Sequence, residues 1–265
     1  MDRKGLVKRL GSAAILVPVV LGVLFAGGWW FVGLMAVTGW LMSHEWNRMC
    51  GGKLDAMLVL YGLVIAAMAG LGAADRVLWA FMALISGLVL AAIMAQIMKR
   101  SVIWAVAGLV YLSIPILALV WLRLVAPQGF YLVLWILCVV WAADSVAFFA
   151  GSAIGGPKLA PAISPNKTWA GAVGGLVGAS LVGVGFALAA DLPMATAMFA
   201  SAFVGLWAEL GDLQESWIKR RLHIKDSGTL IPGHGGLLDR LDSLMFAAPV
   251  VCLMIVLPAQ PWFYL

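Results

Sequence analysis

The sequence predicts an all-α, polytopic integral membrane protein, and three observations lead to this prediction. Of the 265 residues, 64% are hydrophobic and only 11% are charged, whereas a typical soluble domain has about 25% charged residues. The apolar residues form long uninterrupted runs, while the strands of a transmembrane β-barrel alternate polar and apolar side chains. The basic residues gather in every second connection between these runs, as expected when cytoplasmic loops hold most of the lysine and arginine.

The apolar runs number nine, and crossing a bilayer as a helix takes roughly 20 residues. The runs lie near residues 10–28, 29–46, 55–74, 77–97, 102–124, 130–150, 170–190, 194–212 and 241–260. We therefore expect about nine transmembrane helices, organised as a single polytopic membrane domain over residues 1–265.

The basic residues orient these helices. With a cytoplasmic N-terminus, all but Arg76 and Arg123 fall on the inside. The inside set comprises Arg3, Lys4, Lys8, Arg9, Arg48, Lys53, Lys99, Arg100, Lys158, Lys167, Lys219, Arg220, Arg221, Lys225 and Arg240. One span too many or too few would switch the side of every later loop, so the count and the orientation support each other. We expect the N-terminus in the cytoplasm and the C-terminus outside.

Composition also limits the classes of function. The chain has 17 Lys and Arg against 12 Asp and Glu, and the cytoplasmic bias of basic residues explains this excess, so we expect no nucleic-acid partner. Cys50, Cys138 and Cys252 lack the spacing of a disulfide framework or a zinc site. The basic N-terminus with its apolar run resembles a signal peptide, but apolar runs continue along the chain, which favours a retained first helix.

The carboxylates indicate where the chemistry lies. A carboxylate at mid-membrane costs about 2.5–3.5 kcal/mol, so such residues are scarce unless they are needed. Five acids lie in expected loops or at span ends and need no special role: Asp2, Glu45, Asp55, Asp75 and Asp191. The other seven gather near the cytoplasmic ends of the last four spans: Asp144, Glu209, Asp212, Glu215, Asp226, Asp239 and Asp242. We expect the catalytic half at about residues 141–245, with longer polar segments at about 151–169 and 213–240.

Several of these residues recur at helical spacing. One helix face would carry Glu209, Asp212, Ser216 and Lys219, and the start of the final helix would carry Asp239, Asp242 and Ser243. Carboxylates from two helices suit Mg²⁺, which binds hard oxygen ligands together with water and substrate phosphates. Ion pairs with Lys219 or with Arg240 would explain the same carboxylates equally well.

Two connecting segments contain residues that suit phosphate. Residues 225–236 end in Gly233, His234, Gly235 and Gly236, where backbone N–H groups can approach an anion and where a helix begins. Residues 155–168 contain glycines and prolines that forbid a continuous helix, and they offer Ser164, Lys167 and Thr168 as phosphate donors. A plain glycine-rich turn and a surface loop that contacts anionic lipid are the respective alternatives.

These polar segments form an ordered series that resembles the signature of the phosphatidate cytidylyltransferase family, also called CDP-diacylglycerol synthases. The series runs Ser216-Trp-Ile-Lys219-Arg220, Lys225-Asp226-Ser-Gly, Pro232-Gly-His-Gly-Gly236 and Asp239-Arg240-Leu-Asp242. Upstream, Asp144-Ser145, Gly151 and Ser164-Pro-Asn-Lys-Thr-Trp169 resemble a second block of the same family. The blocks cover about residues 141–245, and the first five spans match only as generic membrane helices. The family often has an acidic residue where this chain has Ala170, so we give that position no role.

The resemblance implies a reaction in which CTP and phosphatidate give CDP-diacylglycerol and diphosphate. It implies Mg²⁺ as cofactor, with a monovalent cation such as K⁺ as a further candidate, and it makes Asp212 and Asp239 the metal ligands. It also implies a homodimer among membrane lipids, with a polar cavity that opens to the cytoplasm and to the lipid. For location we expect the bacterial inner membrane, with the active site facing the cytoplasm.

Each candidate residue then has an expected role. Catalytic roles go to Asp212, Asp239, Lys219 and Arg240. Contacts with CTP or phosphatidate go to Ser164, Lys167, Thr168, Ser216, Arg220, Lys225, Gly233, His234, Gly235 and Gly236. Asp144, Asp226 and Asp242 are expected to orient lysines or waters around the site. Phosphatidate is largely deprotonated at pH 7, because the second pKa of a phosphate monoester is about 6, so alignment and charge neutralisation matter more than a strong base.

Other functions fit the sequence less well. Another CTP-using lipid enzyme, such as a synthase acting on an isoprenoid phospholipid or a polyprenol kinase, is the nearest alternative, because lipid tails contact interchangeable apolar helices. A transporter would place polar residues through mid-membrane and often shows inverted repeats. A non-catalytic scaffold gives no reason for the cluster of acids, bases and glycines.

Overall fold

The computed structural model describes residues 3–230 and 235–257, which form nine α-helices and one short β-hairpin. The helices are α1 (Arg3–Ala26), α2 (Gly28–Met49), α3 (Ala56–Ala73), α4 (Val77–Ile97), α5 (Val102–Leu124), α6 (Gly129–Ile154), α7 (Trp169–Ala190), α8 (Met194–Arg221) and α9 (Leu238–Val256). Each apolar run of the sequence overlaps one of these helices over most of its described residues. The all-α class is therefore confirmed.

Six of the described helices, α3 to α8, are long and apolar enough to cross a membrane. Their outer surfaces are apolar too: on α4, for example, Leu78, Ile85 and Ile97 are largely exposed. Exposed apolar area of this extent is rare on soluble proteins but is suited to lipid. The chain is therefore a polytopic membrane protein, while the full count of nine spans and the two termini's sides stay predictions.

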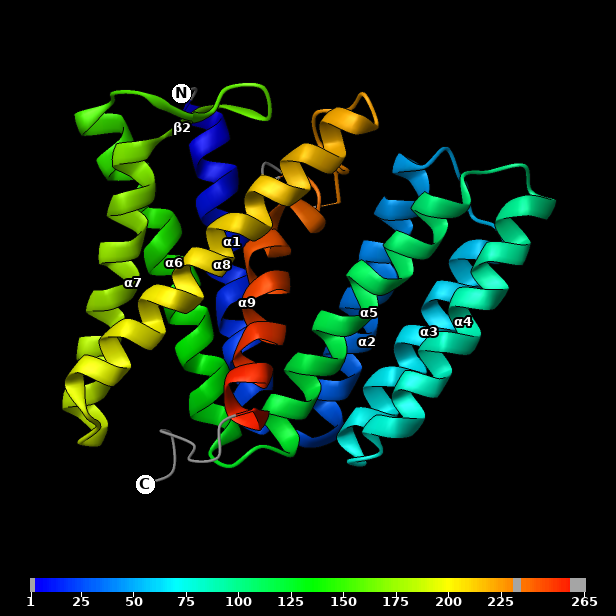
Figure 1. The fold of residues 1–265 in the computed structure, drawn as a ribbon, viewed down its shortest axis with the longest axis horizontal. Helices are drawn as coiled ribbons and strands as arrows, with labels where there is room; N and C mark the ends of the chain where they lie inside the picture. Colours follow the sequence, from blue (N-terminus) through cyan, green and yellow to red (C-terminus); the bar gives the residue numbers. More distant parts are fainter. Residues whose placement is uncertain (1–2, 231–234, 258–265) are drawn as a thin grey trace. The chain divides into compact units, whose positions relative to one another are not determined.

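The chain divides into two compact units. The first unit is Met1–Phe130 with Ile224–Leu241, and the second unit is Tyr131–His223 with Asp242–Leu265. In the first unit, α2 to α5 pack as neighbours (Figure 1). Trp46 of α2 is buried there, and its indole N–H donates to the carbonyl of Trp104 on α5 at 3.1 Å.

Small residues let the helices of the second unit approach closely. The buried residues of α7 are all glycine or alanine, namely Gly171, Gly175, Gly178, Ala179, Gly183 and Ala187. A Cβ on Gly178 would lie 2.9 Å from the carbonyl oxygen of Ala142 on α6. Such residues allow backbones to pack directly, which is how membrane helices associate without a hydrophobic driving force. Helices α7 and α8 pack against each other in this unit.

One stretch that was expected to interrupt the helices has regular structure of its own. Within residues 151–169, β1 (Lys158–Ala160) pairs antiparallel with β2 (Ser164–Thr168). Gly155 and Gly156 have φ of 66° and 92°, and with Pro157 they end α6 and lead the chain into the hairpin. Helix α8 continues to Arg221, so Ser216 and Lys219 lie on it, as their spacing predicted.

A charged cluster joins the ends of α2, α3 and α4 in the first unit. Asp55 caps α3 by accepting from the backbone N–H groups of Met57 and Leu58 at 3.1 and 3.3 Å. Arg100 forms a 2.7 Å ion pair with Asp55 and also donates to the side chain of Asn47. Burial raises the pKa of the Asp55 carboxyl, but hydrogen bonds from Arg100, from the backbone and from Asn47 outweigh this effect and hold the pKa below its ordinary value.

We expect Asp55→Asn to destabilise the protein, because asparagine can still cap α3 but cannot form the ion pair. A loss of about 1 kcal/mol would lower the melting midpoint in detergent at pH 7 by about 2–4 °C. Since the folded pKa is lowered, this stabilisation is complete above pH of about 4 and is lost as the pH falls through the lowered value. Melting curves of wild type and Asp55→Asn that coincide at pH 7 would contradict the assignment; the exposed Asp191→Asn is the matched control.

Candidate functional site

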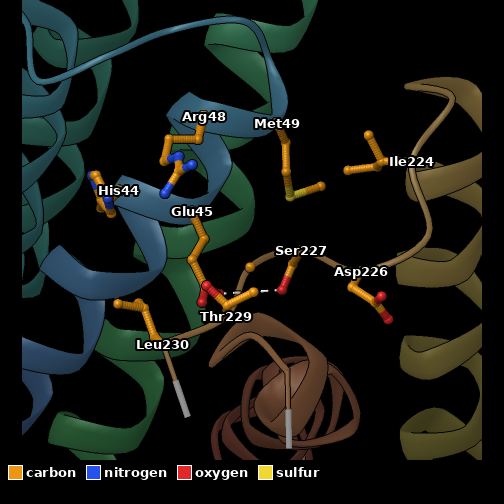
Figure 2. Close-up of a pocket in the computed structure, with 10 residues that line it drawn as sticks. His44, Glu45, Arg48, Met49, Ile224, Asp226, Ser227, Thr229 and Leu230 are labelled. Atoms are coloured by element: carbon orange, nitrogen blue, oxygen red, sulfur yellow. Dashed lines mark hydrogen bonds between the residues drawn. The ribbon is translucent and has the colours of Figure 1, made fainter. Parts of the chain in front are cut away.

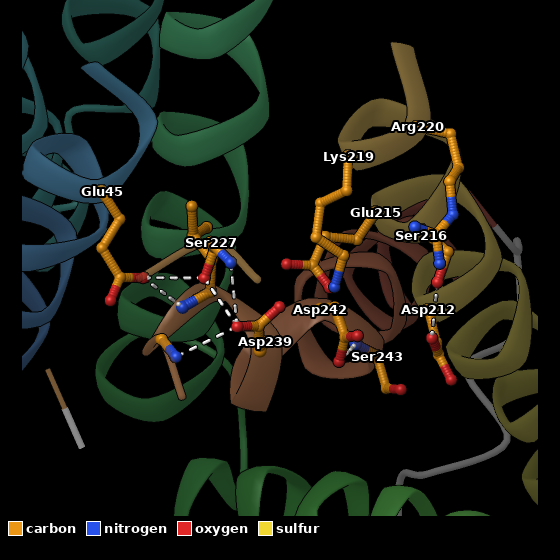
Figure 3. Close-up of polar contacts among 12 residues, drawn as sticks. Glu45, Asp212, Glu215, Ser216, Lys219, Arg220, Ser227, Asp239, Asp242 and Ser243 are labelled. Carbon is orange, nitrogen blue, oxygen red and sulfur yellow. Dashed lines mark hydrogen bonds and ion pairs between the residues drawn. The ribbon is translucent and has the colours of Figure 1, made fainter. Parts of the chain in front are cut away.

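The start of α9 holds a network of hydrogen bonds to Asp239 in the first unit. One oxygen of Asp239, Oδ2, accepts from the backbone N–H of Gly236 at 3.0 Å and from the backbone N–H of Ser227 at 3.1 Å. It also accepts from the Ser227 hydroxyl at 2.9 Å (Figure 3). Gly235 precedes this turn with φ of 87°, which favours glycine. The carboxylate thus binds the two ends of the 227–236 segment together.

Glu45 was expected to have no special role, and this expectation was wrong. It lies on α2, is 2% exposed, and accepts from the backbone N–H groups of Leu237 and Leu238 at 2.8 Å each. Its Oε2 also accepts from the Ser227 hydroxyl at 3.2 Å. The error arose because a single acid near the end of an apolar run resembles an interfacial residue. A buried carboxylate needs such donors, since burial of an unpaired charge is costly.

A pocket of about 260 Å³ lies beside this network in the first unit. Figure 2 shows Glu45 and Ser227 joined by a hydrogen bond at this pocket, with Arg48, His44 and Asp226 around them. The remaining lining residues are Met49, Ile224, Gly228, Thr229 and Leu230. The pocket therefore places polar groups from α2 next to the 224–230 segment.

In the second unit, α8 presents the predicted polar face (Figure 3). Asp212 forms a 2.7 Å ion pair with Lys167 of β2, and its other oxygen accepts from Ser216 at 3.4 Å. The Asp212 side chain is 33% exposed, which leaves it accessible to a ligand. The structure thus brings together three residues that the sequence placed on two separate segments.

Lys219 has a carboxylate partner on its own helix. Its ammonium group lies 3.1 Å from Oε2 of Glu215, four residues earlier, and the Glu215 side chain is 2% exposed. The carboxyl group of Asp242 on α9 contacts Glu215 and accepts from the backbone N–H of Ser243 at 2.7 Å. The ion pair proposed as the alternative for Lys219 therefore exists. A role for Lys219 toward substrate stays a prediction.

The β-hairpin positions the other residues expected to contact phosphate. The Oγ1 of Thr168 caps α7 by accepting from the backbone N–H of Gly171 at 3.1 Å, and Thr168 is 5% exposed. Ser164 begins β2 and is half-buried. Arg220 is exposed at the end of α8, and its Nε donates to the carbonyl of Ile163 at 3.3 Å.

The remaining candidates fall into two groups. Four are exposed, namely Asp144 on α6, Lys225 and Asp226 in the segment before α9, and Arg240 in the first turn of α9. Gly233 and His234 lie outside the described residues, as does the middle of the predicted glycine-rich loop. Their roles stay predictions.

Glu209 is a further acid on the buried side of α8. It is 8% exposed, and among the described residues its Oε1 has no hydrogen-bond partner. A Cβ on Gly175 of α7 would overlap this oxygen, so the glycine makes room for it. Lys167, Asp144 and Asp212 are its charged neighbours. The sequence had placed Glu209 on the same face as Asp212, and the structure agrees.

The carboxylates present fit the chemistry of a divalent cation. Asp239 and Asp212 each accept only from N–H, hydroxyl or ammonium donors among the contacts above, as charged carboxylates do. In the part of the chain that the structure describes, no three His, Cys, Asp or Glu side chains lie close enough together to hold a metal ion. Mg²⁺ suits this donor set, because it takes one or two carboxylates and completes its coordination with water and substrate phosphates.

Comparison of the sequence with known proteins shows the family of the chain. The model of a family described as the cytidylyltransferase family matches residues 7–257. A phosphatidate cytidylyltransferase of Brucella abortus biovar 1 is 36% identical over 259 residues, which are 96% of this chain and 94% of that protein. Phosphatidate cytidylyltransferases of Bacillus subtilis and Haemophilus influenzae are 44% and 45% identical over 121 and 128 residues. These two matches cover 45% and 46% of this chain, and 45% and 44% of the respective relatives.

The family model spans nearly the whole chain, and the Brucella relative aligns along almost its full length. The resemblance that rested on the ordered polar segments of the C-terminal half thus extends through the helices before them. The chain belongs to the cytidylyltransferase family.

Proposed function

We propose that this protein is a phosphatidate cytidylyltransferase of the bacterial inner membrane. The observation that carries the proposal is the similarity to the Brucella phosphatidate cytidylyltransferase over 96% of the chain. Six of the described helices are long and apolar enough to cross a membrane, which agrees with a lipid substrate. The polar network around Asp239 and the ion pair of Asp212 supply the charged groups that a reaction between two phosphates needs.

Asp212 and Asp239 are the residues that would hold Mg²⁺. The two residues belong to different units of the structure. The family resemblance is therefore the reason for proposing that both bind the same ion. A bound Mg²⁺ would neutralise the CTP phosphates and favour departure of diphosphate. Lys167 at 2.7 Å orients the Asp212 carboxylate, and Ser227 with Gly236 orients that of Asp239.

The reaction joins two polyanions. An oxygen of the phosphatidate phosphate donates an electron pair to the α-phosphorus of CTP, and a new P–O bond forms. The bond between the α-phosphorus and its bridging oxygen breaks, and that electron pair leaves with diphosphate. Lys219, Arg220, Arg240 and the 233–236 loop would stabilise the negative charge that grows on diphosphate. Ser164, Lys167 and Thr168 are our candidates for contacts with the lipid headgroup or with the cytidine phosphates.

The orientation follows from the basic residues. All but two of the lysines and arginines fall on one side when nine spans are assumed, which assigns the catalytic segments to the cytoplasm. CTP is a cytoplasmic substrate, so this orientation agrees with the reaction. Two copies of the chain are expected to assemble, as the family resemblance implies.

The direct test uses purified protein in detergent with phosphatidate and CTP labelled on the α-phosphate. We expect the label to appear in a lipid, with release of diphosphate, only when Mg²⁺ is present. A lack of labelled lipid from folded protein would contradict the proposal. An isoprenoid phospholipid as acceptor, and then γ-labelled CTP with a polyprenol, would test the alternative CTP-using lipid enzymes.

Asp212→Asn should lower turnover by at least about 100-fold, because asparagine loses the charge that would hold Mg²⁺ and the ion pair with Lys167. Label transfer to lipid measures the effect, and the melting midpoint reports folding. Asp191→Asn is the matched control, since Asp191 is exposed at the end of α7 and tolerates asparagine in its left-handed conformation. Turnover and Mg²⁺ dependence like those of wild type would show that Asp212 is not a metal ligand.

Gly236→Ala should also lower the activity, for a steric reason. A Cβ at this position would overlap the Ser227 hydroxyl and lie 2.8 Å from both Oε2 of Glu45 and the backbone nitrogen of Gly228. We expect at least about a tenfold loss of label transfer, because the residues around Asp239 would have to move. Gly70→Ala on α3 is the control, since open space surrounds that glycine. Equal activity of Gly236→Ala and Gly70→Ala would contradict the packing described.

A further inference from the structure

We propose that Glu45 is a positioning residue for cytidylyl transfer: from α2 it holds the segment before α9 and, through Ser227, fixes the orientation of Asp239. The proposal rests on the proposed function, in which Asp239 is a metal ligand. It adds a residue on α2, far upstream of the motif-bearing segments. The steps below use contacts within the first unit alone.

The first step concerns the start of α9, which has no local capping side chain. Gly236 and Leu237 precede the helix, and neither carries a side-chain oxygen. Helices usually begin after Ser, Thr, Asp or Asn, whose oxygen accepts from the free N–H groups of the first turn. Here the two oxygens of Glu45 accept from the N–H groups of Leu237 and Leu238, at 2.8 Å each. Glu45 therefore caps α9 from another helix.

The second step concerns the hydroxyl of Ser227, which lies between two carboxylates. It is 3.2 Å from Oε2 of Glu45 and 2.9 Å from Oδ2 of Asp239. One hydroxyl proton cannot form a full bond to both, so Glu45 and Asp239 share it. The backbone N–H of Ser227 donates to Asp239 as well, at 3.1 Å. A movement of Glu45 would therefore be transmitted to Asp239 through one residue.

The third step concerns packing around the Glu45 carboxylate. A Cβ on Gly228 would lie 2.6 Å from Oε1, and a Cβ on Gly236 would lie 2.8 Å from Oε2. Both glycines therefore leave the room that the Glu45 oxygens occupy. Glu45 and Ser227 are 2% and 6% exposed, so loss of either side chain leaves buried polar groups without their partner. Both glycines lie within residues 225–236, the segment that the sequence predicted to approach phosphate.

Glu45→Gln isolates this role, because it keeps the size of the side chain. The amide has one acceptor oxygen and an NH₂ group that would face an N–H donor of α9. We expect turnover to fall by about 10–100-fold and the Mg²⁺ concentration for half-maximal activity to rise several-fold, as when a residue that orients a metal ligand is changed. The KM for CTP at saturating Mg²⁺ should stay within about threefold of wild type.

Two controls separate positioning from folding. Asp191→Asn is the matched carboxylate-to-amide change at an exposed site. A merely structural cap would lower the melting midpoint and the yield of folded Glu45→Gln but would leave the Mg²⁺ dependence of the folded molecules unchanged. If Glu45→Gln does not fold, Ser227→Ala breaks the same link while leaving the two bonds from Glu45 to α9 in place, and the same shift in Mg²⁺ dependence is expected. Where both fold, Ser227→Ala should cost less activity in the Glu45→Gln background than in the wild type, because the two changes share the contact between Glu45 and Ser227.

The outcomes distinguish the two proposals. Wild-type turnover and Mg²⁺ dependence in folded Glu45→Gln, or in folded Ser227→Ala, would overturn the positioning role. An inactive wild type would instead contradict the proposed function. An active wild type with the expected shift in Glu45→Gln would support both.

Discussion

The carboxylates of Glu45 and Asp239 hold the residues that flank 231–234, and the arrangement of the polar groups at the start of α9 depends on them. Buried backbone N–H groups need acceptors, and the residues just before α9 offer none in their side chains. Glu45 supplies two acceptor oxygens from α2, and Asp239 accepts from Ser227 and Gly236. Both carboxylates lie at the N-terminal end of α9, where the helix dipole favours negative charge. The described residues on both sides of 231–234 are thus held by these two carboxylates.

A membrane protein with few charged residues must concentrate its polar chemistry at the ends of its helices. The second unit does this with the ion pair of Asp212 with Lys167 and with the group formed by Glu215, Lys219 and Asp242. Each buried carboxylate in these groups has a cation or a hydrogen-bond donor nearby, as burial of charge demands. Elsewhere on α7, glycine and alanine bring the helix backbones together.

The helices could be predicted well from the sequence, because long apolar runs and helix length are both set by the thickness of the bilayer. The face of α8 with Asp212, Ser216 and Lys219 also followed from spacing alone, since residues three and four apart meet on a helix. Local patterns did not reveal the hairpin of residues 158–168, whose glycines and prolines signalled only an interruption of the helix. They also missed that Thr168 caps α7, although Thr before an apolar run is a capping signal.

Glu45 could not be predicted in this way, because its partners lie 182 to 193 residues further along the chain. Its one local signal was an acid that ends an apolar run beside Trp46, and such an acid is equally typical of a membrane interface. The ion pair of Lys219 was foreseen only as one of two explanations. Spacing allowed both, and the choice between them depended on which carboxylate the chain places beside the ammonium group.

Amide hydrogen exchange of the wild-type protein tests the central interaction most directly. Our account predicts that the N–H groups of Ser227, Gly236, Leu237 and Leu238 exchange much more slowly than those of an unstructured peptide, because each donates to a buried or half-buried carboxylate. Fragmentation that resolves single residues would separate these amides from their neighbours. Exchange of all four at the rate of an unstructured chain would contradict the claim that Glu45 and Asp239 hold this segment.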